Sequence, residues 1–207
     1  MASNRQRSES VSNTETLFTR RRSIRAFSDR EVEFAVLERL FEAARWAPSS
    51  YNEQPWRFLF ARRGEAAFEA LAQCLLPSNR QWASRAAVLV LTAVDSRLAA
   101  KGQPNRYAWH DAGMALQNLL LQATNLGLLG HPMAGFDAAQ VRQVFHLPET
   151  WQPVTITALG YPGDPSSLPP ELRSRETAPR QRKALSELVF HGSFDRPAIF
   201  SKTTNDR

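Results

Sequence analysis

The spacing of hydrophobic positions changes several times along the chain, and each spacing predicts an element. Phe34–Ala44 places apolar residues at three- and four-residue steps, which predicts an amphipathic helix that ends before Pro48. Glu65–Leu76 has the same helical spacing. Trp56–Arg62 is aromatic, and Ala86–Val94 is a continuous apolar run bounded by charges. Both patterns predict strands, and the second predicts a central strand of a sheet.

Tyr107–Leu128 is the longest helical pattern, and it is apolar around most of its circumference. Its sustained polar stripe consists of Asp111, Asn118, Gln122 and Asn125. Such a helix must be covered on most of its circumference, and a chain of 207 residues has little else to wrap around it. We therefore infer that a second subunit covers part of it. Ala112, Gly113 and Ala115 would let another backbone approach closely.

The remaining segments complete an α+β pattern. We expect short helices at Glu15–Arg22, Ala138–Phe145 and Ala184–Val189, a strand at Trp151–Leu159, a tight loop at Pro132–Phe136 and a long surface loop at Pro162–Pro179. Two helical connections would suit parallel neighbouring strands. However, helices and strands do not alternate regularly enough for a doubly wound sheet, and no GxGxxG is present. The class is therefore α+β, with one domain at residues 17–189 and two arms, residues 1–16 and 190–207.

Composition and charge indicate the cellular compartment and limit the classes of binding partner. No run approaches the roughly 20 apolar residues of a membrane span, so no membrane partner is expected. Met1–Thr16 lacks the apolar core of a secretory signal, and the single cysteine, Cys74, fits a reducing cytoplasm as a buried structural thiol. The net charge of +6 invites a nucleic-acid interpretation, but the arginines are scattered and form no basic stripe. We expect no nucleic-acid partner.

The sequence offers no self-sufficient catalytic group. Ser49 and Ser50 lie outside any GxSxG motif, and the four histidines share no spacing with a carboxylate that would suit a triad. No HExxH or other metal-ligand spacing occurs, so no metal is expected. If the protein is an enzyme, a bound cofactor carries the reaction.

Two stretches on either side of one amphipathic segment are the candidates for binding such a cofactor. Arg21–Phe27 (RRSIRAF) supplies rigid positive donors suited to a phosphate or an oxidised heterocycle, and Ala47–Phe58 (APSSYNEQPWRF) supplies hydroxyls and amides. Taken alone, RRSIR is also an ordinary basic patch. A second basic cluster, Arg180, Arg182 and Lys183, could join Arg21 on one phosphate. The backbone N–H groups of Ala134 and Gly135 could reach a ring nitrogen, although a simple turn is the plainer interpretation.

These stretches resemble the nitroreductase family of FMN-dependent oxidoreductases. RRSIRAF looks like that family's opening motif, and APSSYNEQPWRF looks like its PSxxNxQPWxF motif. NRQWASRAAVLVL, GLLGHPMAGF and RKALSEL match in order and spacing. The resemblance covers Thr16–Val189.

The resemblance implies a mostly antiparallel sheet flanked by helices, with a long buried helix at the interface of an interlocked homodimer. It implies FMN in two interface sites, with Pro48–Gln54 arriving from the partner subunit. The cofactor-binding residues that it implies are Arg21, Arg22, Ser23, Arg25, Pro48, Ser49, Ser50, Asn52, Gln54, Asn79, Pro132, Met133, Ala134, Gly135, Arg182 and Lys183. NAD(P)H would give hydride to flavin N5, and a small electrophile such as a nitroaromatic or quinone would take it in a ping-pong cycle. No catalytic side chain is implied.

Two departures and two alternatives remain open. Many members carry Glu-Gly or Gly-Gly where Ala134-Gly135 stands, and Trp82 lies where some relatives place a lysine near the flavin. The same fold also serves dehalogenases and flavin-destructases, whose inserted lids are longer than Pro162–Pro179 or Asp95–Asn105. A flavin-binding protein without turnover is the other alternative.

Overall fold

The computed structural model describes residues 16–98 and 102–199, so most of the expected N-terminal arm and the end of the C-terminal arm lie outside the described residues. The chain divides into two compact units, residues 1–176 and 177–207, which are described separately. The helices are α2 (Phe34–Arg45), α3 (Ala66–Cys74), α4 (Pro77–Ala83), α5 (Ala108–Asn125), α6 (Ala138–Val144) and α7 (Pro170–Thr177). The strands are β1 (Trp56–Arg62), β2 (Val88–Asp95), β3 (Leu129–Met133) and β4 (Trp151–Gly160).

The four strands form one sheet in the order β1-β2-β4-β3, and every neighbouring pair is antiparallel. The predicted α+β class with an antiparallel sheet is confirmed. The helical connection from β1 to β2 joins antiparallel neighbours, although its length would also have suited a parallel pair.

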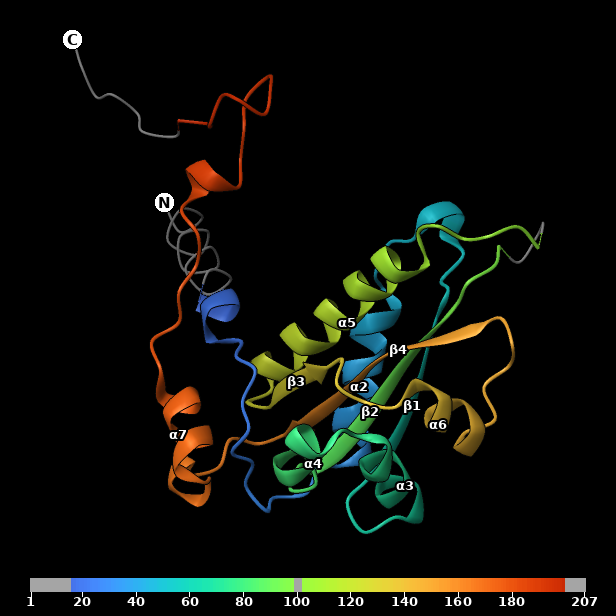
Figure 1. The fold of residues 1–207 in the computed structure, drawn as a ribbon, viewed down its shortest axis with the longest axis vertical. Helices are drawn as coiled ribbons and strands as arrows, with labels where there is room; N and C mark the ends of the chain where they lie inside the picture. Colours follow the sequence, from blue (N-terminus) through green and yellow to red (C-terminus); the bar gives the residue numbers. More distant parts are fainter. Residues whose placement is uncertain (1–15, 99–101, 200–207) are drawn as a thin grey trace, which may run out of the picture. The chain divides into compact units, whose positions relative to one another are not determined.

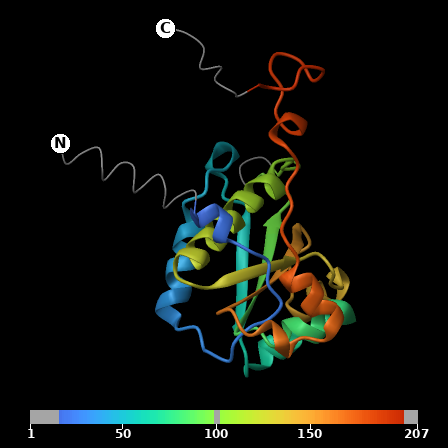
Figure 2. The ribbon, with the colours of Figure 1, turned by 90° about the vertical axis from the view of Figure 1, so that its left-hand side faces the viewer.

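Helices cover both faces of this sheet. Figures 1 and 2 show α2 and α5 together on one face and α3, α4 and α6 on the other. Strand β2 lies at the centre and is buried on both sides: Leu89 and Leu91 pack toward the α3 face, whereas Val88 and Val90 pack toward the α5 face. This double burial explains why its sequence is a continuous apolar run rather than an alternating one.

Three elements were not expected from the pattern. Strand β3 overlaps the start of the predicted Pro132–Phe136 loop; its Pro132 is tolerated because β3 is an edge strand with only one neighbour. Helix α4 is short and begins with Pro77. Helix α7 lies in the predicted Pro162–Pro179 loop and buries only Leu172, so it has no amphipathic pattern to recognise.

Helix α5 is buried along one side and open along another. Ala112, Ala115 and Leu119 are fully buried in the core beneath α2 and the sheet. Trp109, Gly113 and Gln117, spaced four residues apart, are exposed. Nothing lies within 4 Å of the position that a Cβ on Gly113 would take. Part of this helix therefore has no cover within the described chain.

In the second unit, the one described helix is a 3-10 turn at Leu185–Glu187, within the predicted Ala184–Val189 turn. Considered by itself, this unit leaves large apolar side chains exposed, namely Leu185, Leu188, Phe194 and Ile199.

Candidate functional site

The arginine segment, Arg21–Phe27, lies along one end of the sheet. Phe27 forms a bridge with Pro162, just beyond the end of β4, and the Ser28 amide donates to the Tyr161 carbonyl at 3.0 Å. On β3, His131 Nδ1 lies 3.0 Å from the Ile24 carbonyl oxygen, so the Nδ1–H tautomer donates there. These contacts fix the segment against β3 and β4.

An aromatic cluster supports Arg25 from below. The Arg25 guanidinium lies over the Trp82 ring, 5.7 Å from its centroid, at a distance suited to a cation–π contact. Trp82 is fully buried and packs against the rings of Phe27 and His131, at 6.5 and 4.6 Å between centroids. The tryptophan in the lysine position is thus a buried support for Arg25.

His131 is held neutral in this setting. Burial lowers its pKa from 6.5 to about 4, and the nearby charges of Arg25 and Arg21 act in the same direction. The hydrogen bond to Ile24 opposes them only partly. His131 therefore adds no positive charge to the arginine segment at neutral pH.

Asn79 and Gly135, both predicted site residues, touch each other. Asn79 Nδ2 donates to the Gly135 carbonyl oxygen at 3.0 Å, and the Leu76 amide donates to the same oxygen at 3.1 Å. A Cβ on Gly135 would stand 2.5 Å from Asn79 Nδ2. Among the described residues, the backbone N–H groups of Ala134 and Gly135 have no protein acceptor. Pro132 and Met133 lead into this turn as the end of β3.

The loop Pro48–Gln54 has an unusual backbone. Tyr51, Asn52 and Gln54 all have positive φ angles, between 47° and 56°, which non-glycine residues rarely adopt. Within the loop, Ser49 Oγ accepts from the Gln54 amide at 3.0 Å, and the Gln54 side chain donates to Asn52. From α5, Asp111 Oδ2 accepts from the Ser50 amide at 2.9 Å. The Asp111 side chain is only 2% exposed, so it anchors the loop from the interior.

The structure does not bring this loop and the arginine segment together within one chain. The loop precedes β1, whose first residue pairs with Val94 near the end of β2. The arginine segment lies beyond the end of β4, where Leu159 pairs with Val88 at the start of β2. The eight residues of β2 thus separate them by roughly 25 Å. Figure 1 shows the same separation at the two ends of α5.

The other two predicted residues lie in the second unit. Arg182 and Lys183 are both exposed, and Arg182 Nη1 donates to the neighbouring Gln181 carbonyl at 2.7 Å. Their part in a phosphate site stays a prediction.

Sequence reasoning missed three residues that hold these parts in place: His131, Asp111 and Glu176. The Glu176 carboxylate accepts from the amides of Arg25 and Ala26. No local pattern signals such contacts, since Glu176 lies 151 residues from Arg25 along the chain. Asp111 was read only as part of a polar stripe.

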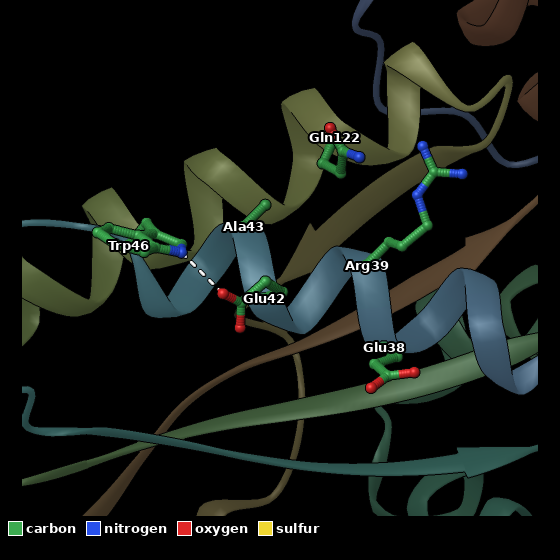
Figure 3. Close-up of a pocket in the computed structure, with 6 residues that line it drawn as sticks. All are labelled: Glu38, Arg39, Glu42, Ala43, Trp46 and Gln122. Atoms are coloured by element: carbon green, nitrogen blue, oxygen red, sulfur yellow. Dashed lines mark hydrogen bonds between the residues drawn. The ribbon is translucent and has the colours of Figure 1, made fainter.

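The hollow drawn in Figure 3 is separate from these residues. It lies between α2 and α5, with a volume of about 450 Å³, and it is lined by Glu38, Arg39, Glu42, Ala43, Trp46 and Gln122. Trp46 Nε1 donates to Glu42 Oε1 at 2.7 Å, yet the tryptophan is 73% exposed. None of the predicted cofactor residues lines it. It belongs to the partly uncovered α2–α5 side of the molecule.

Comparison with solved structures defines the class of protein. The fold matches that of a protein described as an oxidoreductase containing FMN, with a TM-score of 0.82 and 31% identity over 86% of this chain and 91% of that one. It also matches a provisionally named nitroreductase from Desulfovibrio desulfuricans described in complex with FMN, with a TM-score of 0.70 and 27% identity over 86% and 96% of the two chains. The fold is thus that of an α+β oxidoreductase. The nitroreductase family model matches residues 18–161, and the chain belongs to the nitroreductase family.

Sequence relatives agree with this assignment. A protein from Streptomyces coelicolor, provisionally named NADH dehydrogenase/NAD(P)H nitroreductase, is 33% identical over 72% of this chain and 83% of its own length. An uncharacterised 15.4 kDa protein from Mycolicibacterium smegmatis is 34% identical over 68% of this chain and 99% of its own. Within the described residues, no helix is long and apolar enough to cross a membrane.

Proposed function

We propose that this protein is an FMN-dependent NAD(P)H oxidoreductase that reduces nitroaromatics, quinones or related small electrophiles. The observation that carries the proposal is the arrangement at the β3 end of the sheet. Trp82 of α4 supports Arg25, Asn79 of the same helix contacts Gly135, and the Ala134 and Gly135 N–H groups have no protein acceptor among the described residues. Such a set binds and orients a charged, planar cofactor and leaves the chemistry to it.

The residues present suit FMN by their chemistry. An arginine guanidinium can form bidentate hydrogen bonds with phosphate. We assign Arg21, with Arg182 and Lys183, to the phosphate. We assign Arg25 to the pyrimidine end of the ring, where its charge stabilises added electrons. A side chain at Gly135 would have to displace the Asn79 amide, which lies 2.5 Å from the place of a Cβ. The amides of Ala134 and Gly135 are thus open to a ring nitrogen.

FMN, when bound, would supply the redox chemistry between NAD(P)H and the acceptor, which we propose to be hydride transfer through N5 in a ping-pong cycle. The protein residues bind and orient the cofactor. Arg25 presents a fixed positive charge on its aromatic support, while neutral His131 holds the segment without adding charge. No side-chain proton donor is assigned a role.

We further propose that the active form is a homodimer. The loop with Ser49, Ser50 and Asn52 lies too far from Arg25 to share a cofactor within one chain, so the second wall comes from a partner. The open side of α5 and the exposed Trp46 support an interface there, because burying such apolar area is favourable. The exposed apolar residues of the second unit, including Phe194, would then pack on the partner subunit.

The test begins with the purified protein. Full-length protein should be yellow, or should take up FMN on reconstitution, and should reduce a nitroaromatic or a quinone at the expense of NADH or NADPH. Arg25→Ala should retain less FMN and slow its reduction, whereas Arg175→Ala, in an exposed pair with Glu171, should match the wild type. Protein that does not take up FMN would overturn the proposal.

A further inference from the structure

Glu176 places a buried carboxylate inside the arginine segment. Its Oε1 accepts from the backbone amides of Arg25 at 3.0 Å and Ala26 at 3.3 Å, and its Oε2 lies 3.0 Å from the Arg25 amide. Its own carbonyl oxygen accepts from Arg22 Nη2 at 2.9 Å. The side chain is only 7% exposed. A buried carboxylate is stable only when it is well hydrogen-bonded, and here the donors are backbone amides of the arginine segment.

The same carboxylate also faces the Arg25 side chain. Arg25 Nη1 lies 3.8 Å from Glu176 Oε2, while the guanidinium rests on the Trp82 ring. The Arg25 side chain keeps 22% of its surface exposed, so it can still meet a ligand. Glu176 thus places one negative charge beside the arginine assigned to the flavin ring.

Helix α7 buries little apolar surface of its own. It buries Leu172 as its one apolar anchor, and its exposed Glu171–Arg175 pair contributes little to stability. The Glu176 carboxylate accepts from the Arg25 amide, and the Glu176 carbonyl accepts from Arg22. The helix thus presents Glu176 to the arginine segment.

We propose that Glu176 is a positioning residue of the cofactor site, acting through Arg25; this rests on the proposed function. Its two amide contacts hold residues 25 and 26 in the shape that binds FMN. Its charge offsets part of the positive potential of Arg25, so that the reduced, negatively charged flavin is stabilised less than three unopposed arginines would allow. Glu176 thereby keeps the bound flavin a stronger reductant.

Two substitutions distinguish the role of the Glu176 hydrogen bonds from the role of its negative charge. Glu176→Gln keeps one oxygen that can accept both amides in the place of Oε1, loses the contact of Oε2 with the Arg25 amide and removes the negative charge. Glu176→Ala removes every one of these contacts and the charge. Glu171→Gln, on the exposed side of the same helix, is the matched control. Circular dichroism of each variant checks that it folds.

Amide hydrogen exchange in FMN-free protein tests the holding role without any turnover. Glu176→Ala should speed exchange at Arg25 and Ala26 by about tenfold or more, the effect of losing hydrogen bonds to a charged group, and weaken FMN binding by a similar factor. Glu171→Gln should stay within about threefold of wild type, and Glu176→Gln should fall between it and Glu176→Ala. Unchanged exchange in Glu176→Ala would overturn the holding role.

The midpoint potential of bound FMN tests the proposed effect of the negative charge of Glu176. Glu176→Gln should shift it in the positive direction, and Glu171→Gln should leave it unchanged. A potential that is unchanged or more negative in Glu176→Gln would overturn this role. Wild-type protein that takes up no FMN would instead overturn the proposed function, and with it any cofactor role of Glu176, while amide exchange would still report whether Glu176 holds the segment.

Discussion

The Asn79 amide occupies the space that a side chain at Gly135 would need. Asn79 Nδ2 donates to the Gly135 carbonyl at 3.0 Å, and a Cβ there would lie 2.5 Å from the same nitrogen. The glycine is thus favoured by the hydrogen-bonded Asn79 amide beside it rather than by its backbone angles, since its φ is not among the positive values. This contact shapes the turn that presents the Ala134 and Gly135 amides.

Gly135→Ala should push Asn79 aside and distort this turn. We expect a loss of about 1–3 kcal/mol in unfolding free energy, as for overpacked sites, and weaker FMN binding. The measurement is denaturant unfolding and FMN titration. In an Asn79→Ala background the same change should cost much less, because the clash is gone. Equal costs in both backgrounds would show that the contact is not responsible.

Removing Asp111 should release the Pro48–Gln54 loop. Its carboxylate is 2% exposed and accepts from the Ser50 amide, so Asp111→Ala leaves a buried amide without its partner. We expect about 1–3 kcal/mol of destabilisation and faster amide exchange at Ser50. Because Tyr51, Asn52 and Gln54 hold strained angles, the loop should then relax and FMN affinity should fall. Asp111→Asn, which keeps an acceptor oxygen, should do less harm; equal damage would argue against the hydrogen bond.

His131 makes stability depend on pH in a defined window. Its folded pKa of about 4 lies below the ordinary 6.5, so the unfolded chain binds the proton more readily. Stability is therefore full above about pH 6.5 and falls as the pH drops toward 4, by up to about 3 kcal/mol. His131→Asn should flatten this part of the stability curve in FMN-free protein. Parallel curves for the two proteins between pH 7 and 4.5 would contradict the assignment.

The open side of α5 predicts a dimer interface. Gly113 faces empty space in the single chain, so Gly113→Arg should fold as well as wild type. On the interface it would place a charge between subunits, and sedimentation should show a shift toward monomer together with weaker FMN binding. Gln103→Arg, at an exposed position outside the helix, is a control. A dimer that tolerates Gly113→Arg would place the interface elsewhere.

The elements that pattern predicted well are those whose burial is regular. Strand β2 carries a long apolar signal because it is buried on both faces, and helix α5 carries one because a long side of it is buried against α2 and the sheet. Strand β3, with its glycine and proline, has the composition of a turn and becomes a strand only because β4 pairs with it. Tertiary pairing overrode local preference there.

The candidate site likewise contains residues that the motifs predicted and residues that they did not. Arg25, Asn79 and Gly135 were predicted from the motifs. The structure shows that Asn79 contacts Gly135 and that Arg25 lies over Trp82, and their part in binding a cofactor stays a prediction. Glu176 and Asp111 were not identified, since a carboxylate that accepts a distant backbone amide leaves no mark on its own neighbours in sequence. Such supports can be found only once the chain is folded.

We propose that one cofactor lies between the arginine segment of one subunit and the Pro48–Gln54 loop of the other. The direct test is a mixed dimer of Arg25→Ala and Asn52→Ala subunits, purified through two different tags and titrated with FMN. If the site is shared, one site of the mixed dimer carries both changes and the other carries neither. We predict that half of the sites regain wild-type affinity, although both parent homodimers bind weakly. Mixed dimers whose two sites stay as weak as those of the parents would contradict the claim.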